Sequence, residues 1–368
     1  MRLIRPMKLA RVCTVAASLL AFTAAVPAAG FAQAKKPAAK TTTAKKVAAT
    51  KKTGYSASSS SARKARLARA RAASRSRERA RQNTLRVVQE AMTPRFKLDA
   101  TGARVPDIRA AAAVIFDPQS GQVLWGENAQ DKRSIASITK VMTAVVFLED
   151  DPDLSQVVTV ERGDVYAAST TYLRANERIS LDNLLHLTLI ASDNAAARAL
   201  ARLSHGGTVS FVERMNSKAL ELGLDSTSFA DPSGLRSENV SSAIDLSKLI
   251  TYAATDEKIS ATVAPIMRMA EYKVTTSRRT VNIRNTNRLV VDGDVEVMGG
   301  KTGFISKAGH CLATLLRLPQ TNQTVAVVVL GANSNPGRFW ETRHLFNWLS
   351  TNTTGLFVKD QQHQQHEQ

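Results

Sequence analysis

The charge of this chain is divided at about residue 97, and that division decides which part can form a globular core. Residues 1–97 contain 23 lysines and arginines and 2 acidic residues, whereas residues 98–368 contain 27 and 29. The net charge of +19 therefore resides entirely in the first quarter of the chain. The remaining, nearly neutral part is long enough for one large domain or two ordinary ones.

The first 34 residues have the pattern of a secretory signal peptide. An uncharged apolar run at 12–26 precedes the small-x-small sequence Ala32-Gln33-Ala34, and follows the basic residues Arg2, Arg5, Lys8 and Arg11. The apolar run is shorter than the ~20 residues that a membrane span needs. We therefore expect cleavage after Ala34 and export to the periplasm or cell envelope, with an uncleaved anchor as the alternative.

Residues 35–103 are expected to form a basic, low-complexity, disordered segment. Lys, Ala, Thr, Arg and Ser dominate it, and so few large apolar residues cannot offset the entropy of ordering. The Arg/Ala/Ser tract within it also allows partial helix. Two short motifs found here, Lys52-Thr53-Gly54 and Ser61-Ala-Arg-Lys64, are interpreted as compositional accidents because catalysis needs fixed geometry.

From residue 104 the chain changes to periodic apolar patterns. A β-hairpin is predicted at 110–127, and amphipathic or buried helices are predicted at 134–150 and within 180–255, with shorter irregular pieces at 151–179. Strand patterns follow from about residue 270, and a closing helix covers 336–349. This order predicts an α+β domain in which one antiparallel sheet has helices on its faces and a mostly helical insertion between its halves.

Ser137-Ile-Thr-Lys140 begins the first predicted helix, so its serine and lysine share one face. A serine hydroxyl is a poor nucleophile unless a base takes its proton. Lysine can be that base when burial and neighbouring charge lower its pKa. Taken alone, the motif favours an ordinary first helical turn with a solvated lysine over a catalytic pair.

Two further motifs support a catalytic interpretation of Ser137 and Lys140. Ser192-Asp193-Asn194 interrupts a buried helix, where a hydroxyl and an amide can relay a proton and hold a substrate amide. Lys301-Thr302-Gly303 lies in a predicted strand, where the glycine permits close approach of a substrate backbone. The three motifs follow one another at spacings of 55 and 109 residues. Their order and their positions on a helix start, a helix break and a strand indicate an active-site serine enzyme.

The chain resembles the low-molecular-mass penicillin-binding proteins, which are serine D-alanyl-D-alanine peptidases of bacterial cell walls. The resemblance covers about 107–350 and includes DPQSGQVLWGEN, IASITKVMTAVV, DPSGL, NTNRLV and GKTGFISKAGHCL. It implies the serine β-lactamase/DD-peptidase-like fold, an antiparallel five-stranded sheet flanked by helices. It also implies a catalytic domain at 104–350, a polar tail at 351–368, covalent inhibition by β-lactams, and no cofactor or metal.

The resemblance also assigns roles to residues. Ser137 would be the acylated nucleophile and Lys140 its base. Ser192 would shuttle a proton, while Asn194, Lys301, Thr302 and Gly303 would bind the substrate. The backbone N–H groups of Ser137 and Phe304 would form the oxyanion hole. NTNRLV, GKTGFISKAGHCL and the short sequence after the closing helix favour the D-alanyl-D-alanine endopeptidase branch over the carboxypeptidases.

Four other interpretations compete with this one. A class A β-lactamase shares all three motifs, and Glu221-Leu-Gly-Leu-Asp225 faintly resembles its deacylation site. An exported, non-catalytic polyanion-binding protein, or a nucleic-acid-binding protein, fits the basic residues 35–97, although export argues against nucleic acid. A Ser-His-Asp hydrolase lacks its G-x-S-x-G motif, and the tail residues His363 and His366 fit solvated side chains better than metal ligands.

Overall fold

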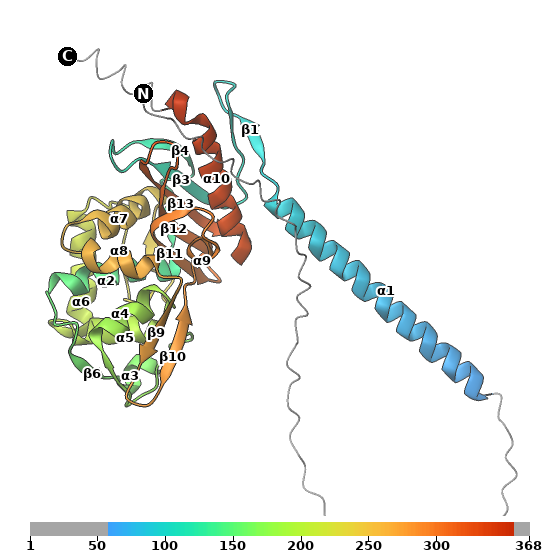
Figure 1. The fold of residues 1–368 in the computed structure, drawn as a ribbon, viewed down its shortest axis with the longest axis horizontal. Helices are drawn as coiled ribbons and strands as arrows, with labels where there is room; N and C mark the ends of the chain where they lie inside the picture. The colour runs from blue at the N-terminus through green and yellow to red at the C-terminus, as the bar shows by residue number, and fades with distance from the viewer. Residues whose placement is uncertain (1–57, 357–368) are drawn as a thin grey trace, which may run out of the picture. The chain divides into compact units, whose positions relative to one another are not determined.

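The structure, a computed structural model, describes residues 58–356 (Figure 1). Residues 1–57 lie outside the described part, and they include the predicted signal peptide at 1–34. Residues 357–368, which contain the two tail histidines, also lie outside it. The chain divides into two compact units after Ala68, and each is described by itself. Residues 58–68 of the first unit are helical, and residues 69–356 of the second contain every other described element.

A five-stranded antiparallel sheet organises the second unit, in the order β11-β12-β13-β3-β4. Its first pair is the predicted hairpin, β3 (Ala112–Phe116) and β4 (Val123–Glu127). The other three strands come from the end of the chain: β11 (Glu296–Ile305), β12 (Gly309–Arg317) and β13 (Thr324–Ala332). Pairing of β13 with β3 joins the two halves, which confirms the predicted α+β fold with a helical insertion.

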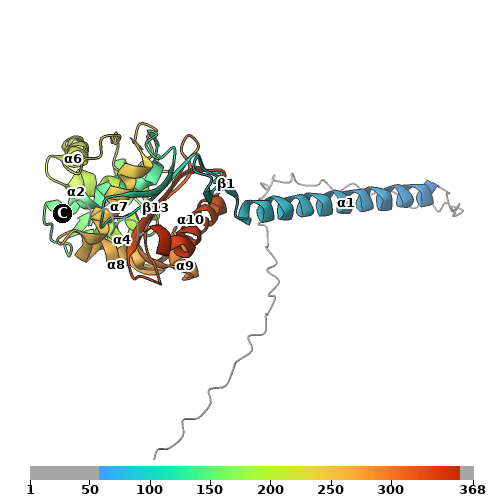
Figure 2. The same cartoon turned by 90° about the horizontal axis from the view of Figure 1, so that it is seen from above.

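Both faces of this sheet are buried, which explains why its strands have nearly continuous apolar sequences. On one face, Ile115 and Val327 pack with α10 (Asn335–Leu356), the predicted closing helix. On the other face, Val114 and Val328 pack with α7 (Ala243–Thr255) and the helical insertion. Figure 2 shows β13 between α7 and α10. The alternation of neighbours between two cores follows from the two-residue period of a strand.

The insertion consists mainly of helices that surround α2 (Thr139–Glu149), whose middle is buried on all sides. The remaining elements of the insertion are η1 (Ala136–Ile138), α3 (Arg162–Val165), α4 (Leu181–Leu189), α5 (Asn194–Leu203), α6 (Gly207–Glu221), α8 (Ser260–Arg268) and the short strands β5 (Arg133–Ser134), β6 (Val157–Thr159), β7 (Arg178–Ser180) and β8 (Val240–Ser241). The two predicted strands after residue 270 are β9 (Glu271–Thr275) and β10 (Thr280–Arg284), which pair with each other as a separate hairpin. The short helix α9 (Arg288–Asp292) leads into β11.

The expectation of disorder is wrong for 58–92, which form one long helix, α1 (Ser58–Met92). Its described side chains are exposed, so no hydrophobic core holds it. Alanine and arginine have high intrinsic helix propensity, and that preference here outweighs the repulsion between like charges. Low apolar content therefore excluded a core without excluding secondary structure.

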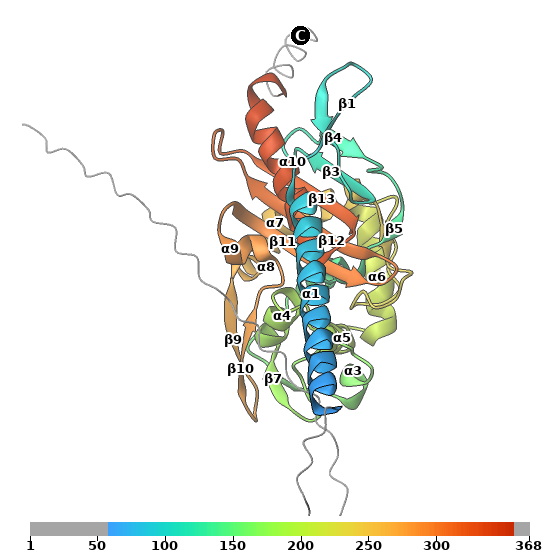
Figure 3. The same ribbon diagram turned by 90° about the vertical axis from the view of Figure 1, so that its right-hand side faces the viewer.

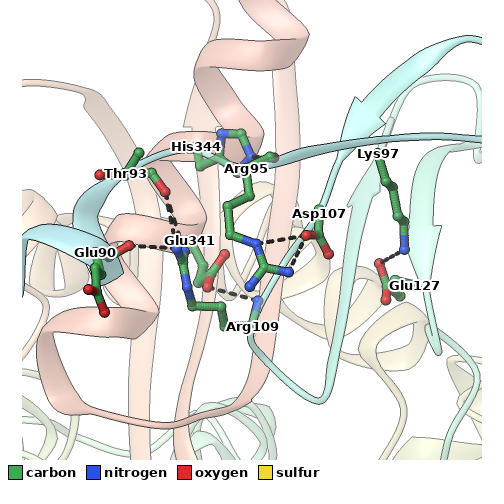
Figure 4. Close-up of polar contacts among 9 residues, drawn as sticks. All are labelled: Glu90, Thr93, Arg95, Lys97, Asp107, Arg109, Glu127, Glu341 and His344. Carbon is green, nitrogen blue, oxygen red and sulfur yellow. Dashed lines mark hydrogen bonds and ion pairs between the residues drawn. The ribbon is translucent and has the colours of Figure 1, made fainter. Parts of the chain in front are cut away.

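The C-terminal end of α1 is held by polar contacts with Arg109 (Figure 4). The Arg109 guanidinium donates to the carbonyls of Glu90, at 2.5 Å, and Thr93, at 3.3 Å. The Arg109 backbone N–H donates to Glu341 of α10 at 2.9 Å. Strands β1 (Phe96–Leu98) and β2 (Arg104–Pro106) follow, with ion pairs Arg95–Asp107 and Lys97–Glu127. The ordered unit thus begins before residue 104, the predicted domain boundary.

Candidate active site

Ser137 lies in the 3₁₀ turn η1, directly before α2, and Lys140 is the second residue of that helix. The turn is tight, and Ala136 adopts a left-handed conformation with φ +50°. One helical turn then brings Lys140 Nζ to 2.9 Å from Ser137 Oγ. The predicted serine–lysine pair is therefore in hydrogen-bonding contact.

The Lys140 side chain is fully buried. Its Nζ also contacts Asn194 Oδ1 at 2.6 Å and the Ser233 carbonyl at 2.5 Å. Burial lowers the pKa of Lys140 to about 7, although the negative charges of Asp193 and Asp231 act in the opposite direction. A large fraction of this lysine is thus neutral near neutral pH.

Ser192-Asp193-Asn194 connects α4 to α5 opposite this pair. Ser192 has a left-handed backbone, φ +59°, and lines the pocket described below. Asp193 caps α5 through the Ala196 N–H and also accepts the Tyr172 N–H. Asn194 Nδ2 donates to the Ala168 carbonyl at 2.7 Å, which orients its oxygen toward Lys140.

Lys301-Thr302-Gly303 lies on β11, an edge strand of the sheet. Lys301 is buried, and its Nζ donates to the Thr302 carbonyl at 3.0 Å. Burial, with the charges of Lys140 and Arg338, lowers the pKa of Lys301 well below its ordinary value. A Cβ atom on Gly303 would lie 2.5 Å from the Ile135 carbonyl and 3.2 Å from the Ser137 nitrogen. Only glycine lets the strand lie this close to the serine.

One pocket collects most of the predicted site residues, which come from three separate parts of the chain. It is lined by Ser137, Ser192, Asn194, Thr302, Gly303 and Phe304, with Ser169, Thr170, Ala191, Leu235, Thr286, Ile305, Ser306 and Arg338. Lys140 and Lys301 are buried next to these lining residues. No carboxylate belongs to the lining formed by the described residues.

Arg338 is a pocket residue that the sequence analysis missed. It lies near the start of α10, is only 6% exposed, and donates through Nη1 to the Gly303 carbonyl at 3.0 Å. Burial lowers its pKa to about 10, and its Nε has no hydrogen-bond partner among the described residues. A buried cation in a pocket without acidic lining is suited to an anionic ligand. No local pattern marks this arginine, because its role depends on contact between α10 and β11.

The loop containing DPSGL is a second missed element. Asp231 accepts the backbone N–H groups of Ser233 at 2.6 Å and Gly234 at 2.9 Å. Burial alone would raise the Asp231 pKa, but hydrogen bonds from the Ser233 hydroxyl, the Arg236 and Ser233 N–H groups and the Asn239 side chain keep it below its ordinary value. The loop presents the Ser233 carbonyl to Lys140 and places Gly234 against Ala136. In the sequence this motif contributed to the family resemblance, but nothing there indicated its role.

Residues that supported the other interpretations lie elsewhere. Glu221 ends α6, is not part of the pocket, and pairs with Lys218 at 2.6 Å. His186 is buried and its ring stacks on Tyr272, with centroids 3.8 Å apart. His310 stacks on Phe304 rather than contacting Ser137.

Comparison with known proteins agrees with this geometry. The family model described as D-alanyl-D-alanine carboxypeptidase matches residues 99–334. A D-alanyl-D-alanine endopeptidase of Escherichia coli is 35% identical over 254 residues, covering 68% of this chain and 81% of the relative. A protein of the same name from Pseudomonas aeruginosa is 34% identical over 257 residues, covering 67% and 78%.

Solved structures show the same similarity. The Streptomyces K15 DD-transpeptidase is 28% identical with a TM-score of 0.61, covering 66% of this chain and 97% of that one. A penicillin-binding protein homologue from Mycobacterium tuberculosis is 26% identical with a TM-score of 0.61, covering 68% and 95%.

Proposed function

The chain belongs to the D-alanyl-D-alanine carboxypeptidase family and is a serine DD-peptidase of the cell wall, and we propose that its acyl-enzyme forms on Ser137. The substrate is the peptide part of peptidoglycan, and β-lactams are covalent inhibitors of this class. The observation that carries the assignment is the 2.9 Å contact between Ser137 Oγ and the buried Lys140, whose pKa is about 7.

The contacts of Lys140 define where its lone pair lies. A neutral amine has two N–H donors and one lone pair. Asn194 Oδ1 and the Ser233 carbonyl can only accept, so they take the two donors. The lone pair is left for the hydroxyl proton of Ser137. Lys140 takes that proton as Oγ attacks the carbonyl carbon of a D-alanyl residue.

The other residues serve charge and proton transfer. The N–H groups of Ser137 and Phe304 stabilise the oxyanion, and the contact of Gly303 with Ser137 permits this arrangement. Lys301, Thr302 and Arg338 hold a substrate carboxylate. As the C–N bond breaks, the proton passes through Ser192 to the leaving amine, and water then hydrolyses the ester on Ser137.

Intact-mass spectrometry after incubation with benzylpenicillin tests this assignment. The protein should gain the mass of one penicillin, and peptide mapping should place it on Ser137. Ser137→Ala should abolish the gain. Ser306→Ala is the matched control, because Ser306 lines the same pocket without a contact to Lys140. Equal labelling of Ser137→Ala would refute the nucleophile, and rapid release of the penicillin would favour a β-lactamase.

We further propose a preference for endopeptidase activity. Three relatives named D-alanyl-D-alanine endopeptidase are 34–35% identical to this chain, and five named carboxypeptidase are 28–32% identical. Separation of muropeptides after digestion tests this proposal. Conversion of cross-linked dimers to monomers should exceed removal of terminal D-alanine from pentapeptides, and the reverse order would overturn the preference.

Export and an electrostatic tether are proposed for the basic N-terminal part of the chain. Among residues 58–356, no helix combines the length and apolarity needed to cross a bilayer. Detection of Lys35 as the N-terminus of the protein recovered from the envelope would establish removal of the signal peptide. Residues 35–97 contain 19 Lys and Arg and 2 acidic residues. The Lys and Arg side chains of α1 that the structure describes are exposed.

This charge should bind anionic envelope polymers and concentrate the enzyme near its substrate. The protein should pellet with purified sacculi at low salt and dissociate at high salt, because the Debye length falls from ~10 Å at 0.1 M to ~3 Å at 1 M. Replacing the arginines at 69, 71, 75 and 77 by glutamine should weaken pelleting without slowing cleavage of soluble peptides. Unchanged pelleting would contradict the tether.

A further inference from the structure

A second cationic surface lies outside the pocket, on the β9–β10 hairpin and the loop beneath its turn. The segments 171–180 and 270–288 contain seven Lys and Arg and two acids, whereas the rest of residues 98–368 contains 20 and 27. Five exposed basic side chains of the hairpin and the loop form a set that we call the hairpin cations: Arg174, Arg178, Lys273, Arg278 and Arg284. The charge of this region is thus opposite to that of the surrounding domain.

The hairpin cations lack partners in the structure. None of their side chains has an ion pair or hydrogen bond among the described residues, whereas Arg202 and Arg343 each bind two carboxylates. The two acids of the same segments do not neutralise them. Glu177 is fully buried and pairs with Arg279 at 3.2 Å, and Glu271 lies opposite Arg284 in the strand register without forming an ion pair.

The hairpin is rigidly held. Val274 and Ile283 are fully buried, and the Tyr272 ring stacks on His186. Because strand neighbours face opposite sides, Lys273 and Arg284 project outward. At the turn, the Ser277 N–H donates to the Arg178 carbonyl at 2.8 Å.

Both segments lead directly to the pocket wall. After β10 the chain reaches Thr286, which lines the pocket and donates its N–H to the Ile190 carbonyl at 3.1 Å. The loop likewise begins at Ser169 and Thr170 in the pocket, and the Thr170 carbonyl accepts the Asn194 N–H at 3.0 Å. A five-residue strand spans roughly 17 Å, so the basic surface extends from the pocket over about that distance.

We propose that the hairpin cations bind carboxylates of the stem peptide away from the cleaved bond, an inference that rests on the proposed function. The pocket holds the D-Ala-D-Ala end of the peptide with its terminal carboxylate. The rest of a cell-wall peptide extends beyond the pocket and carries further carboxylates. Cations that have no partner within residues 58–356 and continue from the pocket wall complement such an acidic peptide. The surface is therefore an extended subsite that selects charged stem peptides.

Two soluble peptides with the same D-Ala-D-Ala end test this subsite in the full-length protein. One carries free carboxylates upstream of that end, and in the other these groups are amidated. The wild type should have a kcat/KM for the charged peptide about threefold to tenfold higher at low salt, as expected for a few exposed charge pairs. In the triple variant Lys273→Gln/Arg278→Gln/Arg284→Gln this ratio should fall close to one.

Lys132→Gln is the matched control, since Lys132 is exposed and precedes β5, on the opposite side of the domain from β9 and β10 in Figure 3. It should keep the wild-type ratio. Titration with fluorescent penicillin counts folded active sites, and if the triple variant does not fold, Lys273→Gln and Arg284→Gln are compared singly.

A wild-type ratio near one, or an unchanged ratio in the hairpin variants, would overturn the subsite. Loss of sacculus binding with an unchanged peptide ratio would also overturn it, since the surface would then serve another polyanion. If the wild type cleaves neither peptide and is also not acylated by penicillin, the proposed function itself fails.

Discussion

Replacing Gly234 by alanine should greatly slow the acylation of Ser137 while lowering the free energy of unfolding only modestly. Gly234 has φ +80°, so any side chain there is strained. A left-handed conformation costs an ordinary residue roughly 1–2 kcal/mol. A Cβ atom would also lie 2.0 Å from the Ala136 carbonyl oxygen and 2.9 Å from the Ser137 nitrogen.

The size of the effect follows from this overlap. Non-bonded heavy atoms prefer separations of about 3.5–4.0 Å, so relief requires a movement of more than an ångström. The backbone that must move carries Ser137, whose Oγ lies 2.9 Å from Lys140 Nζ. Misplacement of reacting groups by ~1 Å can cost about 100-fold in rate, and we expect a loss of that order.

The rate of labelling by fluorescent penicillin measures the loss, and thermal unfolding measures the stability. Gly293→Ala is the matched control, because Gly293 has φ +68° and a Cβ atom there would have no neighbour within 4 Å. It should lose stability from backbone strain and still acylate normally. If folded Gly234→Ala acylates as fast as Gly293→Ala, the DPSGL loop does not position the nucleophile.

Four further outcomes are expected. Acylation by penicillin should accelerate as pH rises through about 7, because only neutral Lys140 accepts the serine proton, and a flat rate profile across that pH would exclude this base. Lys140→Arg should fold but not acylate, because guanidinium stays protonated, as labelling and circular dichroism would show. Arg338→Leu should reduce the preference for peptides with a free carboxylate over their amides about tenfold or more, in competition kinetics, because the buried positive charge and the unpaired Nε donor are removed from the pocket. Arg109→Gln should speed amide hydrogen exchange in the last turn of α1, because the cation at that helix end is removed, and unchanged exchange would contradict this capping role.

The sequence was informative wherever local patterns coincide with tertiary requirements. Runs of β-branched and apolar residues located β3, β12 and β13, and the three motifs located the serine, the helix break and the edge strand of the pocket. Ser180 and Ser242, both of a residue type that commonly caps helices, each accept an N–H from the first turn of α4 and α7. At these positions the local sequence pattern and the tertiary packing favour the same type of residue, so the pattern alone was sufficient.

The prediction was weaker where stability comes from distant contacts or from none. β9 and β10 were recognised as strands, but their separation from the main sheet depends on packing against α4 that no local pattern shows. The short strands β6 and β7, only three residues each, gave no periodic signal. For α1 the error is that disorder was predicted where the structure has a helix. Low apolar content indicates that a segment cannot form a core, but it does not measure helix propensity.

The electrostatics of the site could be inferred only from its assembly. Lys140, Lys301 and Arg338 are far apart in the sequence, yet all are buried around one pocket whose described lining includes no acid. Burial lowers the pKa of each, and the charge of Lys140 lowers that of Lys301 further. Buried cations oppose folding unless negative charge compensates them, and Lys301 and Arg338 have no acid in the described lining to do so. A substrate carboxylate bound between Lys301 and Arg338 would supply the missing charge, while the carbonyl oxygens at Asn194 and Ser233 keep the Lys140 lone pair directed at Ser137. We therefore propose that a bound carboxylate favours the charged forms of Lys301 and Arg338, whereas burial favours the neutral form of Lys140 that can act as the base.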